Sequence, residues 1–364
     1  MRILLIGLAT LALILPGCEH EHSNSGAPDG SGGAGNDAPI GKWVCHGSTD
    51  QTELGRIVSI VNDPSDLSIL YAGTREGFVI KIQYQADRVT NDFLSMPRHY
   101  QTAVRPSAAM TGGAPSVQYL NALSSDYKGG LFAGFAGIMK SENQGQDWTQ
   151  VYNMPTVFSV AVDPSDPSIA FAGTESEGVL KTSDGGKTWN KVKDSIYAMA
   201  VVVEPRGSIL VGDGTGIWKS TDSGSTWNQL SKDFANSITA NPKDANEIYA
   251  GTAASTRGDE TLRYSNDGGR TWTVLRRGFA PTSSDQIIQP ALPIVVSPAN
   301  PSTVYVGTMG AGVMKSTDKG KTWLPLNDGL EDKEVFSLAI DPRDPRILYA
   351  GTASGKFWRI RQSD

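Results

Sequence analysis

The string TSDGGKTW at residues 182–189 returns three more times along the chain in nearly the same form. Each copy has a Ser or Thr, an Asp two positions later, a Gly two positions after the Asp, and a closing Trp. The other copies are STDSGSTW at 220–227, SNDGGRTW at 265–272 and STDKGKTW at 316–323. A motif used four times in one chain is more consistent with a repeated structural part than with a single reactive site.

A degenerate fifth copy of the motif, SENQGQDW, lies at 141–148 with Asn143 in place of the Asp. Two further strings also repeat along the chain, out of phase with this motif. A string typified by YAGT occurs seven times, beginning at positions 71, 132, 171, 210, 249, 305 and 349, and Asp-Pro or a close variant precedes most copies. Repeats of roughly 40 residues that each hold several short strands predict the blades of a β-propeller.

One repeat shows the expected blade. Short β-rich runs at 157–164, 169–174, 178–183 and 188–192 are separated by turn residues, which predicts four strands. The motif then lies on the turn between the third and fourth strands, where its Asp accepts hydrogen bonds from turn amides and its Gly supplies a positive φ. The Trp is placed to pack between neighbouring sheets.

We therefore assign the motif residues to structure. Four equivalent catalytic or metal-binding Asp residues spread around a ring have no chemical rationale. The structural set is Asp184, Trp189, Asp222, Trp227, Asp267, Trp272, Asp318 and Trp323.

The seventh repeat ends at Asp364 without a motif of this kind. The segment GKWVCHG at 41–47 echoes GKTWNKV at 186–192, with Trp43 in the role of the motif Trp. We expect this N-terminal segment to supply the missing fourth strand, which would close the ring and leave no free edge there. The predicted fold is an all-β, seven-bladed β-propeller over residues 41–364.

Residues 1–40 precede that domain. Residues 1–17 have the form of a signal peptide, with an apolar run too short for a comfortable membrane span. The string LPGC ending at Cys18 resembles the lipobox of bacterial lipoproteins, although Pro at its second position is less usual, and a plain secretory signal cut nearby is the alternative. The resemblance implies a lipid on Cys18 and a place in the bacterial cell envelope, on the exported side of a membrane. Residues 18–40 then form a flexible tether.

Composition narrows the partners. The formal net charge is −6, charged residues are 19% of the chain, and no Lys/Arg run occurs, so nucleic acid is not expected as a partner. The Cys and His spacings near Cys18 and Cys45 match no structural zinc site, so we predict no metal and no cofactor. With Cys18 lipidated, Cys45 would remain an unpaired structural thiol.

The string SxDxGxTW identifies a family of repeats. It resembles the Asp-box, also called the BNR repeat, which is found in sialidases, xyloglucan-cleaving glycosidases, the sortilin ectodomain and the photosystem II assembly and stability factors. The repeats span about residues 55–360. Their phrasing is most similar to the photosystem II assembly factor group, with the xyloglucanase-type propellers next. The resemblance implies a β-propeller and says little about function, because the box lies at the blade periphery.

A binding site is expected on one face of the ring. Loops between second and third strands share that face with the blade-to-blade connections, and three insertions at about 85–116, 253–262 and 276–293 fall there. Candidate residues on this face are Arg75, Glu76, Tyr100, Arg105, Glu175, Glu177, Asp213, Arg257, Arg263 and Asp285.

The candidate carboxylates do not form a recognisable catalytic pair. A glycosidase needs two positioned carboxyl groups, and nothing in the sequence singles out a pair among Glu175, Glu177, Asp213 and Asp285. All eight Trp residues lie in boxes, box-like segments or third strands, so none remains to stack sugars. We predict a non-catalytic, envelope-anchored scaffold, a monomer or complex subunit, that binds a protein partner or a membrane complex. The alternatives are a secreted glycoside hydrolase of the xyloglucanase or sialidase-like type, with a glycan as ligand, and a structural subunit of a surface complex.

Overall fold

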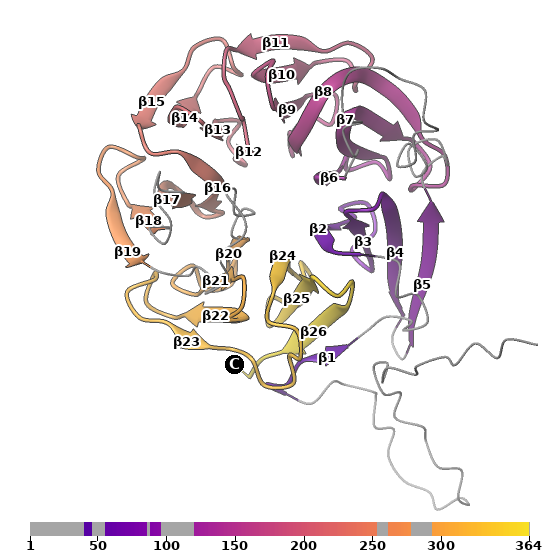
Figure 1. The fold of residues 1–364 in the computed structure, drawn as a ribbon, viewed down its shortest axis with the longest axis vertical. Helices are drawn as coiled ribbons and strands as arrows, with labels where there is room; N and C mark the ends of the chain where they lie inside the picture. The colour runs from indigo at the N-terminus through magenta and orange to yellow at the C-terminus, as the bar shows by residue number, and fades with distance from the viewer. Residues whose placement is uncertain are drawn as a thin grey trace, which may run out of the picture.

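Antiparallel sheets stand radially around a central axis (Figure 1). The computed structural model describes residues 40–45, 55–85, 88–95, 120–252, 261–277 and 293–363. The regular elements of these ranges are strands, β1 to β26. The all-β propeller predicted from the repeats is confirmed.

Five of the blades are separate four-stranded sheets. Blade 1 holds β2 (Ile57–Asn62), β3 (Ile69–Thr74), β4 (Phe78–Gln85) and β5 (Arg88–Ser95). Blade 4 holds β12 (Ala200–Val203), β13 (Ile209–Asp213), β14 (Gly216–Ser220) and β15 (Asn228–Ser231). Blade 5 holds β16 (Ala235–Asn241), β17 (Asp244–Thr252), β18 (Thr261–Ser265) and β19 (Thr273–Arg277). Blade 6 holds β20 (Ile294–Val296), β21 (Val304–Gly307), β22 (Val313–Ser316) and β23 (Leu324–Pro325). Blade 7 holds β24 (Val335–Ile340), β25 (Ile347–Thr352), β26 (Phe357–Arg361) and β1 (Val44–Cys45).

Blades 2 and 3 share a continuous sheet. Its strands are β6 (Ala122–Ser125), β7 (Leu131–Ser141), β8 (Thr149–Val162), β9 (Ala170–Thr174), β10 (Val179–Thr182) and β11 (Asn190–Lys193). The first half of β8 pairs with β7 and the second half pairs with β9, so β8 ends blade 2 and begins blade 3. In the same way, β7 pairs with β6 through its first half and with β8 through its second half. A six-stranded sheet divided in this way, beside five four-stranded sheets, is consistent with the seven blades that the repeats predict.

The N-terminal strand closes the ring. β1 pairs antiparallel with β26, with Val44 opposite Arg359. The side chain of Trp43 is 2% exposed, and its Nε1 donates a 2.7 Å hydrogen bond to the carbonyl of Leu326 in blade 6. In blade 4 the box residue Trp227 donates in the same way to Val192 of the preceding blade. The role predicted for Trp43 is confirmed.

The Asp-Pro string and the YAGT string meet in blades 1 and 7, where both the Asp and the Tyr are present. Tyr71 donates its hydroxyl to Asp63 at 3.1 Å, and Tyr349 donates to Asp341 at 2.8 Å. The other oxygen of Asp63 accepts the backbone amide and the hydroxyl of Ser65, which fixes the turn. The two strings therefore act as one unit that ties the first turn of the blade to its buried second strand.

Each box is a hydrogen-bonded turn. Asp184 accepts the amide and hydroxyl of Thr188 at 2.9 and 2.6 Å and the hydroxyl of Thr182 at 2.8 Å. Gly186, at φ 91°, donates its amide to the same Thr182 hydroxyl. Hydrogen bonds from Thr188 and Thr182 lower the pKa of Asp184 to about 2. The same arrangement lowers the pKa values of Asp222, Asp267 and Asp318 to about 2.

These lowered pKa values predict acid sensitivity. The usual Asp pKa is 3.8, so the contribution of each box Asp to stability is complete above about pH 4 and is lost as the pH falls toward 2. We expect Asp184→Ala and Asp318→Ala each to lower the melting temperature at pH 7. Between pH 4 and pH 2, the melting temperature of each variant should fall less than that of the wild type. If the melting temperatures of variant and wild type fall by the same amount across that pH range, the box Asp residues do not stabilise the fold in the way proposed.

Cys45 forms a disulfide in this structure. The interpretation of Cys45 as an unpaired thiol is therefore wrong. The chain has one other cysteine, Cys18, which lies outside the described residues.

Candidate functional site

Hydrogen bonds between neighbouring turns sort the loops into two faces. On one face, connections between blades bond to the loops after second strands, as in Glu175 N to Thr156 O at 2.8 Å and Gly214 N to Ile196 O at 2.9 Å. On the other, box turns bond to the Asp-Pro turns of their own blades, as in Gly185 N to Ser168 O at 2.9 Å. We call these the loop face and the box face. The division is the one the strand order predicts.

The loop face presents an exposed apolar pair. Ile196 and Tyr197, in the connection from blade 3 to blade 4, are 55% and 45% exposed. Among the described residues they are the only sequence neighbours that are both large, apolar and more than a third exposed. We call this pair the apolar knob.

The backbone of the knob is fixed in place. Tyr197 N donates to Glu175 O at 2.9 Å, the next amide donates to Thr174 O, and Ile196 O accepts Gly214 N. Tyr197 has φ 52°, a left-handed conformation that is uncommon for a residue with a bulky side chain. Residues held in such a conformation by their surroundings cluster at functional sites, and the observed strain supports a hypothesis of function here.

The buried carboxylate of Asp213 also holds this connection, through the Ser195 hydroxyl. Asp213 is fully buried and forms a 2.9 Å ion pair with Lys193, whose side chain is 7% exposed. Its oxygens also accept the hydroxyls of Ser195 and Thr215, each at 2.6 Å. The Lys193 ammonium lies 4.0 Å from the ring centroid of Trp218. Burial raises the pKa of Asp213, but hydrogen bonds from Ser195, Thr215 and Lys193 outweigh it and the pKa is lowered.

Exposed carboxylates flank the knob on blade 3. Glu175 and Glu177 are both exposed, and Glu175 provides the carbonyl that holds Tyr197. Glu177 accepts the Tyr152 hydroxyl at 2.5 Å, which together with partial desolvation raises the pKa of Tyr152 to about 12. The phenol of Tyr152 therefore stays protonated at neutral pH and donates its proton to the Glu177 carboxylate.

The remaining predicted residues are dispersed. Arg75 is half-buried and Glu76 is exposed, both after the second strand of blade 1. Arg263 forms a 2.9 Å ion pair with Asp233. Tyr100, Arg105, Arg257 and Asp285 lie outside the described residues.

Two of the predicted acids are already engaged by other side chains. Asp213 has no exposed surface to offer a ligand, and Glu177 is engaged with Tyr152. No group of three His, Cys, Asp or Glu side chains in the described ranges is arranged to hold a metal ion.

Sequence reasoning missed Ile196 and Tyr197, because it sought the site in the three long insertions and this connection is short. A usable signal was present. In the string KDSIYAMAVVV at 193–203, the expected inner strand begins after residue 197, so an Ile and a Tyr stand together outside any strand.

Sequence comparison relates part of the chain to glycosidases. No protein-family model matches the chain. It is 27% identical over 138 residues to a probable oligoxyloglucan-reducing end-specific xyloglucanase of Neosartorya fischeri, a match covering 34% of this chain and 17% of that protein. It is 38% identical over 84 residues to the xyloglucanase Xgh74A of Acetivibrio thermocellus, covering 18% of this chain and 10% of that enzyme. The chain thus spans less than a fifth of the length of the curated relatives it matches.

Structural comparison finds β-propellers of two kinds. YCF48 bound to a D1 peptide superposes with a TM-score of 0.58 and 11% identity, covering 89% of this chain and 97% of that one. The GH74 xyloglucanase of Xanthomonas campestris superposes with a TM-score of 0.63 and 17% identity, covering 89% of this chain and 54% of that one. At these identities the likeness establishes the fold.

Proposed function

We propose that this chain is a non-catalytic, envelope-anchored propeller that acts as a protein-binding or assembly scaffold. The observation that carries the proposal is the apolar knob, an exposed Ile–Tyr pair on a backbone fixed by three hydrogen bonds. Rigid, exposed apolar side chains mark protein interaction sites, and Tyr is enriched among the residues that dominate binding energy. The likeness to YCF48 over nearly all of that chain, in a structure with a bound D1 peptide, supports the same reading.

The surroundings of the knob define the chemistry of the partner. Glu175 and Glu177 place exposed carboxylates beside it. A complementary protein surface would offer an apolar hollow for Ile196 and Tyr197, bordered by Lys or Arg side chains.

This predicts a knob-dependent interaction. We expect Ile196→Ser combined with Tyr197→Asn to reduce partner recovery at least about tenfold, because the variant removes the central apolar contacts. Asn tolerates the left-handed backbone of position 197, so the fold should be kept. The measurement is quantitative co-purification from detergent-solubilised membranes with the bound proteins identified.

Leu324→Ser is the matched control for the knob variant. Leu324 is 72% exposed but directly follows the box Trp of blade 6, away from the loop face. Its variant should recover the partner as the wild type does. Equal recovery by the knob variant and the control would contradict the proposed docking site.

The envelope anchor is proposed from the LPGC string alone. Within the described ranges, no helix has the length and apolar character needed to cross a bilayer. We expect Cys18→Ala to release a soluble protein or to leave a precursor that keeps its signal. Fractionation followed by mass measurement of the N-terminal peptide tests this, and a membrane-bound variant of mature length would contradict it.

The disulfide at Cys45 gives the same experiment a second readout. One sulfur cannot carry both a lipid thioether and a disulfide. If Cys18 is the partner of Cys45, the fraction of molecules with that disulfide is not lipidated. Non-reducing peptide mapping measures both fractions in one sample.

A glycoside hydrolase is the second candidate, favoured by the sequence matches to xyloglucanases. It requires an accessible pair of carboxyl groups; of the four predicted acids, Asp213 is buried in an ion pair and Glu177 accepts the Tyr152 hydroxyl. Release of reducing sugar from xyloglucan or a sialoside, abolished by Glu175→Gln or Glu177→Gln, would replace the scaffold proposal with this one.

A further inference from the structure

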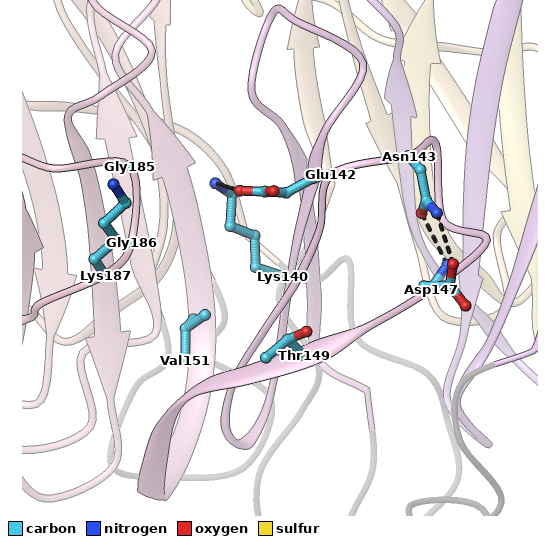
Figure 2. Close-up of a pocket in the computed structure, with 9 residues that line it drawn as sticks. All are labelled: Lys140, Glu142, Asn143, Asp147, Thr149, Val151, Gly185, Gly186 and Lys187. Carbon is cyan, nitrogen blue, oxygen red and sulfur yellow. Dashed lines mark hydrogen bonds and ion pairs between the residues drawn. The ribbon is translucent and has the colours of Figure 1, made fainter.

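A cleft opens between blades 2 and 3 on the box face, at the rim of the ring. Its volume is about 420 Å³. It is lined by Lys140, Glu142, Asn143, Asp147, Thr149, Val151, Gly185, Gly186 and Lys187. Figure 2 shows the box turn of blade 3 on one side, Asn143 and Asp147 on the other, and Lys140 and Glu142 between them.

The residues that depart from the repeat are the ones that line this cleft. In the box of blade 2, Asn143 replaces the usual Asp and Asp147 replaces the usual Thr. The Asn143 amide donates to Asp147 at 2.8 Å, so the turn keeps its cross-link while the carboxylate moves four positions. Glu142 also stands where the other four boxes have an uncharged Ser, Thr or Asn. The cleft therefore has one relocated carboxylate, Asp147, and one additional carboxylate, Glu142.

Packing between these two blades differs from that before blades 5 and 6. In blades 5 and 6, a Cβ added to Gly269 or Gly320 would lie 2.5 or 2.4 Å from the Leu side chain of the preceding blade, so those leucines pack directly against the box turn. A Cβ added to Gly186 would instead meet Phe132 and Lys140. The residue equivalent to the leucines is the smaller Val151, which lines the cleft; blade 3 also has a valine at this position, Val192, and a Cβ added to Gly224 would lie 3.3 Å from it.

The indole nitrogen of Trp189 differs from those of two other box Trp residues. Trp227 and Trp272 each donate their indole N–H to a carbonyl of the preceding blade, at 3.1 and 3.2 Å. The Trp189 Nε1 is buried without a hydrogen-bond partner. Since this nitrogen has no exposed surface, it is not itself a ligand contact.

The charges of the cleft select the ligand. Lys140 and Glu142 neutralise each other in a 2.9 Å ion pair. This leaves the exposed carboxylate of Asp147 on one side and, on the other, the exposed ammonium of Lys187, which forms no ion pair with any described residue. A free anion would meet the carboxylates and a free cation would meet the lysines, whereas a molecule with an ammonium at one end and a carboxylate at the other satisfies both sides.

We propose that this cleft binds a short zwitterionic peptide, with its amino terminus at Asp147 and its carboxylate at Lys187. Its central amide groups lie over the Lys140–Glu142 pair. The site is on the box face and is separate from the apolar knob, so it does not depend on the proposed scaffold function. Exposed ion pairs contribute modestly, so the affinity is weak.

Calorimetric titration of the full-length protein with trialanine tests the proposal. Trialanine is expected to bind, and N-acetyl-trialanine amide, which has no terminal charges, is not. Lys187→Ala and Asp147→Asn should each weaken trialanine binding about three- to fivefold. Lys321→Ala is the matched control, because Lys321 occupies the same box position in blade 6, and it should bind as the wild type does.

A second variant separates binding from folding. Val151→Leu installs the side chain that blades 4 to 6 carry at this position, so it should fill the cleft and reduce binding more than about tenfold without lowering the melting temperature. The proposal is overturned if neither peptide binds at millimolar concentration, if the capped peptide or inorganic phosphate binds as well as trialanine, or if Lys187→Ala and Lys321→Ala behave alike.

Discussion

Replacing Trp43 by Ala is expected to lower the free energy of unfolding by about 3–5 kcal/mol, the range for removing a large buried aromatic side chain. Trp43 is 2% exposed and packs in a cluster with Leu330, Leu348 and Trp358 at the junction of blades 6 and 7. The variant also removes the donor to the Leu326 carbonyl. Because β1 is only two residues long and pairs with β26 alone, loss of its anchor should release the strand and expose an edge of blade 7.

Two deletions test whether ring closure is the cause. Deleting 41–47 should destabilise the whole domain, as measured by chemical denaturation, whereas deleting 19–38 should have little effect. The second deletion removes the N-terminal segment just before residues 41–47 but leaves Trp43 and β1 intact. Equal melting temperatures for the two deletions would show that the N-terminal strand does not hold the ring together.

The propeller was predictable because its stabilising contacts are periodic in sequence. A box Asp bonds to a Thr four residues later, and a YAGT Tyr bonds to an Asp eight residues earlier. Such local bonds leave a fixed spacing that a single sequence reveals. Ring closure was predictable for the same reason, since Trp43 repeats the box Trp together with its neighbours.

The site was less predictable because its contacts are not periodic. Asp213 is the last residue of the buried strand β13 and was expected on an accessible loop, but Lys193, the last residue of β11 and twenty residues earlier, packs against it. Exposure of Ile196 and Tyr197 depends on the same connection. The cleft between blades 2 and 3 was hidden in a copy of the box that looked merely degenerate.

Asp213→Ala is also expected to lower the free energy of unfolding by a large amount. Removing this carboxylate leaves the Lys193 ammonium buried without its counter-ion, a change that typically costs 3–5 kcal/mol. It also removes the acceptor for Ser195 and Thr215, which hold the connection below the knob. Asp194→Ala is the control, because Asp194 is an exposed neighbour whose ion pair with Lys191 lies at the surface and contributes little.

Lys193→Met combined with Asp213→Ala distinguishes the ion pair from a general packing defect. Met removes the buried charge and keeps an apolar chain of similar length over Trp218, so the double variant should recover part of the stability lost in Asp213→Ala. It should not recover partner binding, since the bonds from Ser195 and Thr215 that fix the knob are still missing. Recovery is therefore expected in urea denaturation but not in co-purification. If the double variant is as unstable as Asp213→Ala, the uncompensated charge of Lys193 is not the cause of the lost stability. A double variant that regained the partner would mean that the position of the knob does not depend on Asp213.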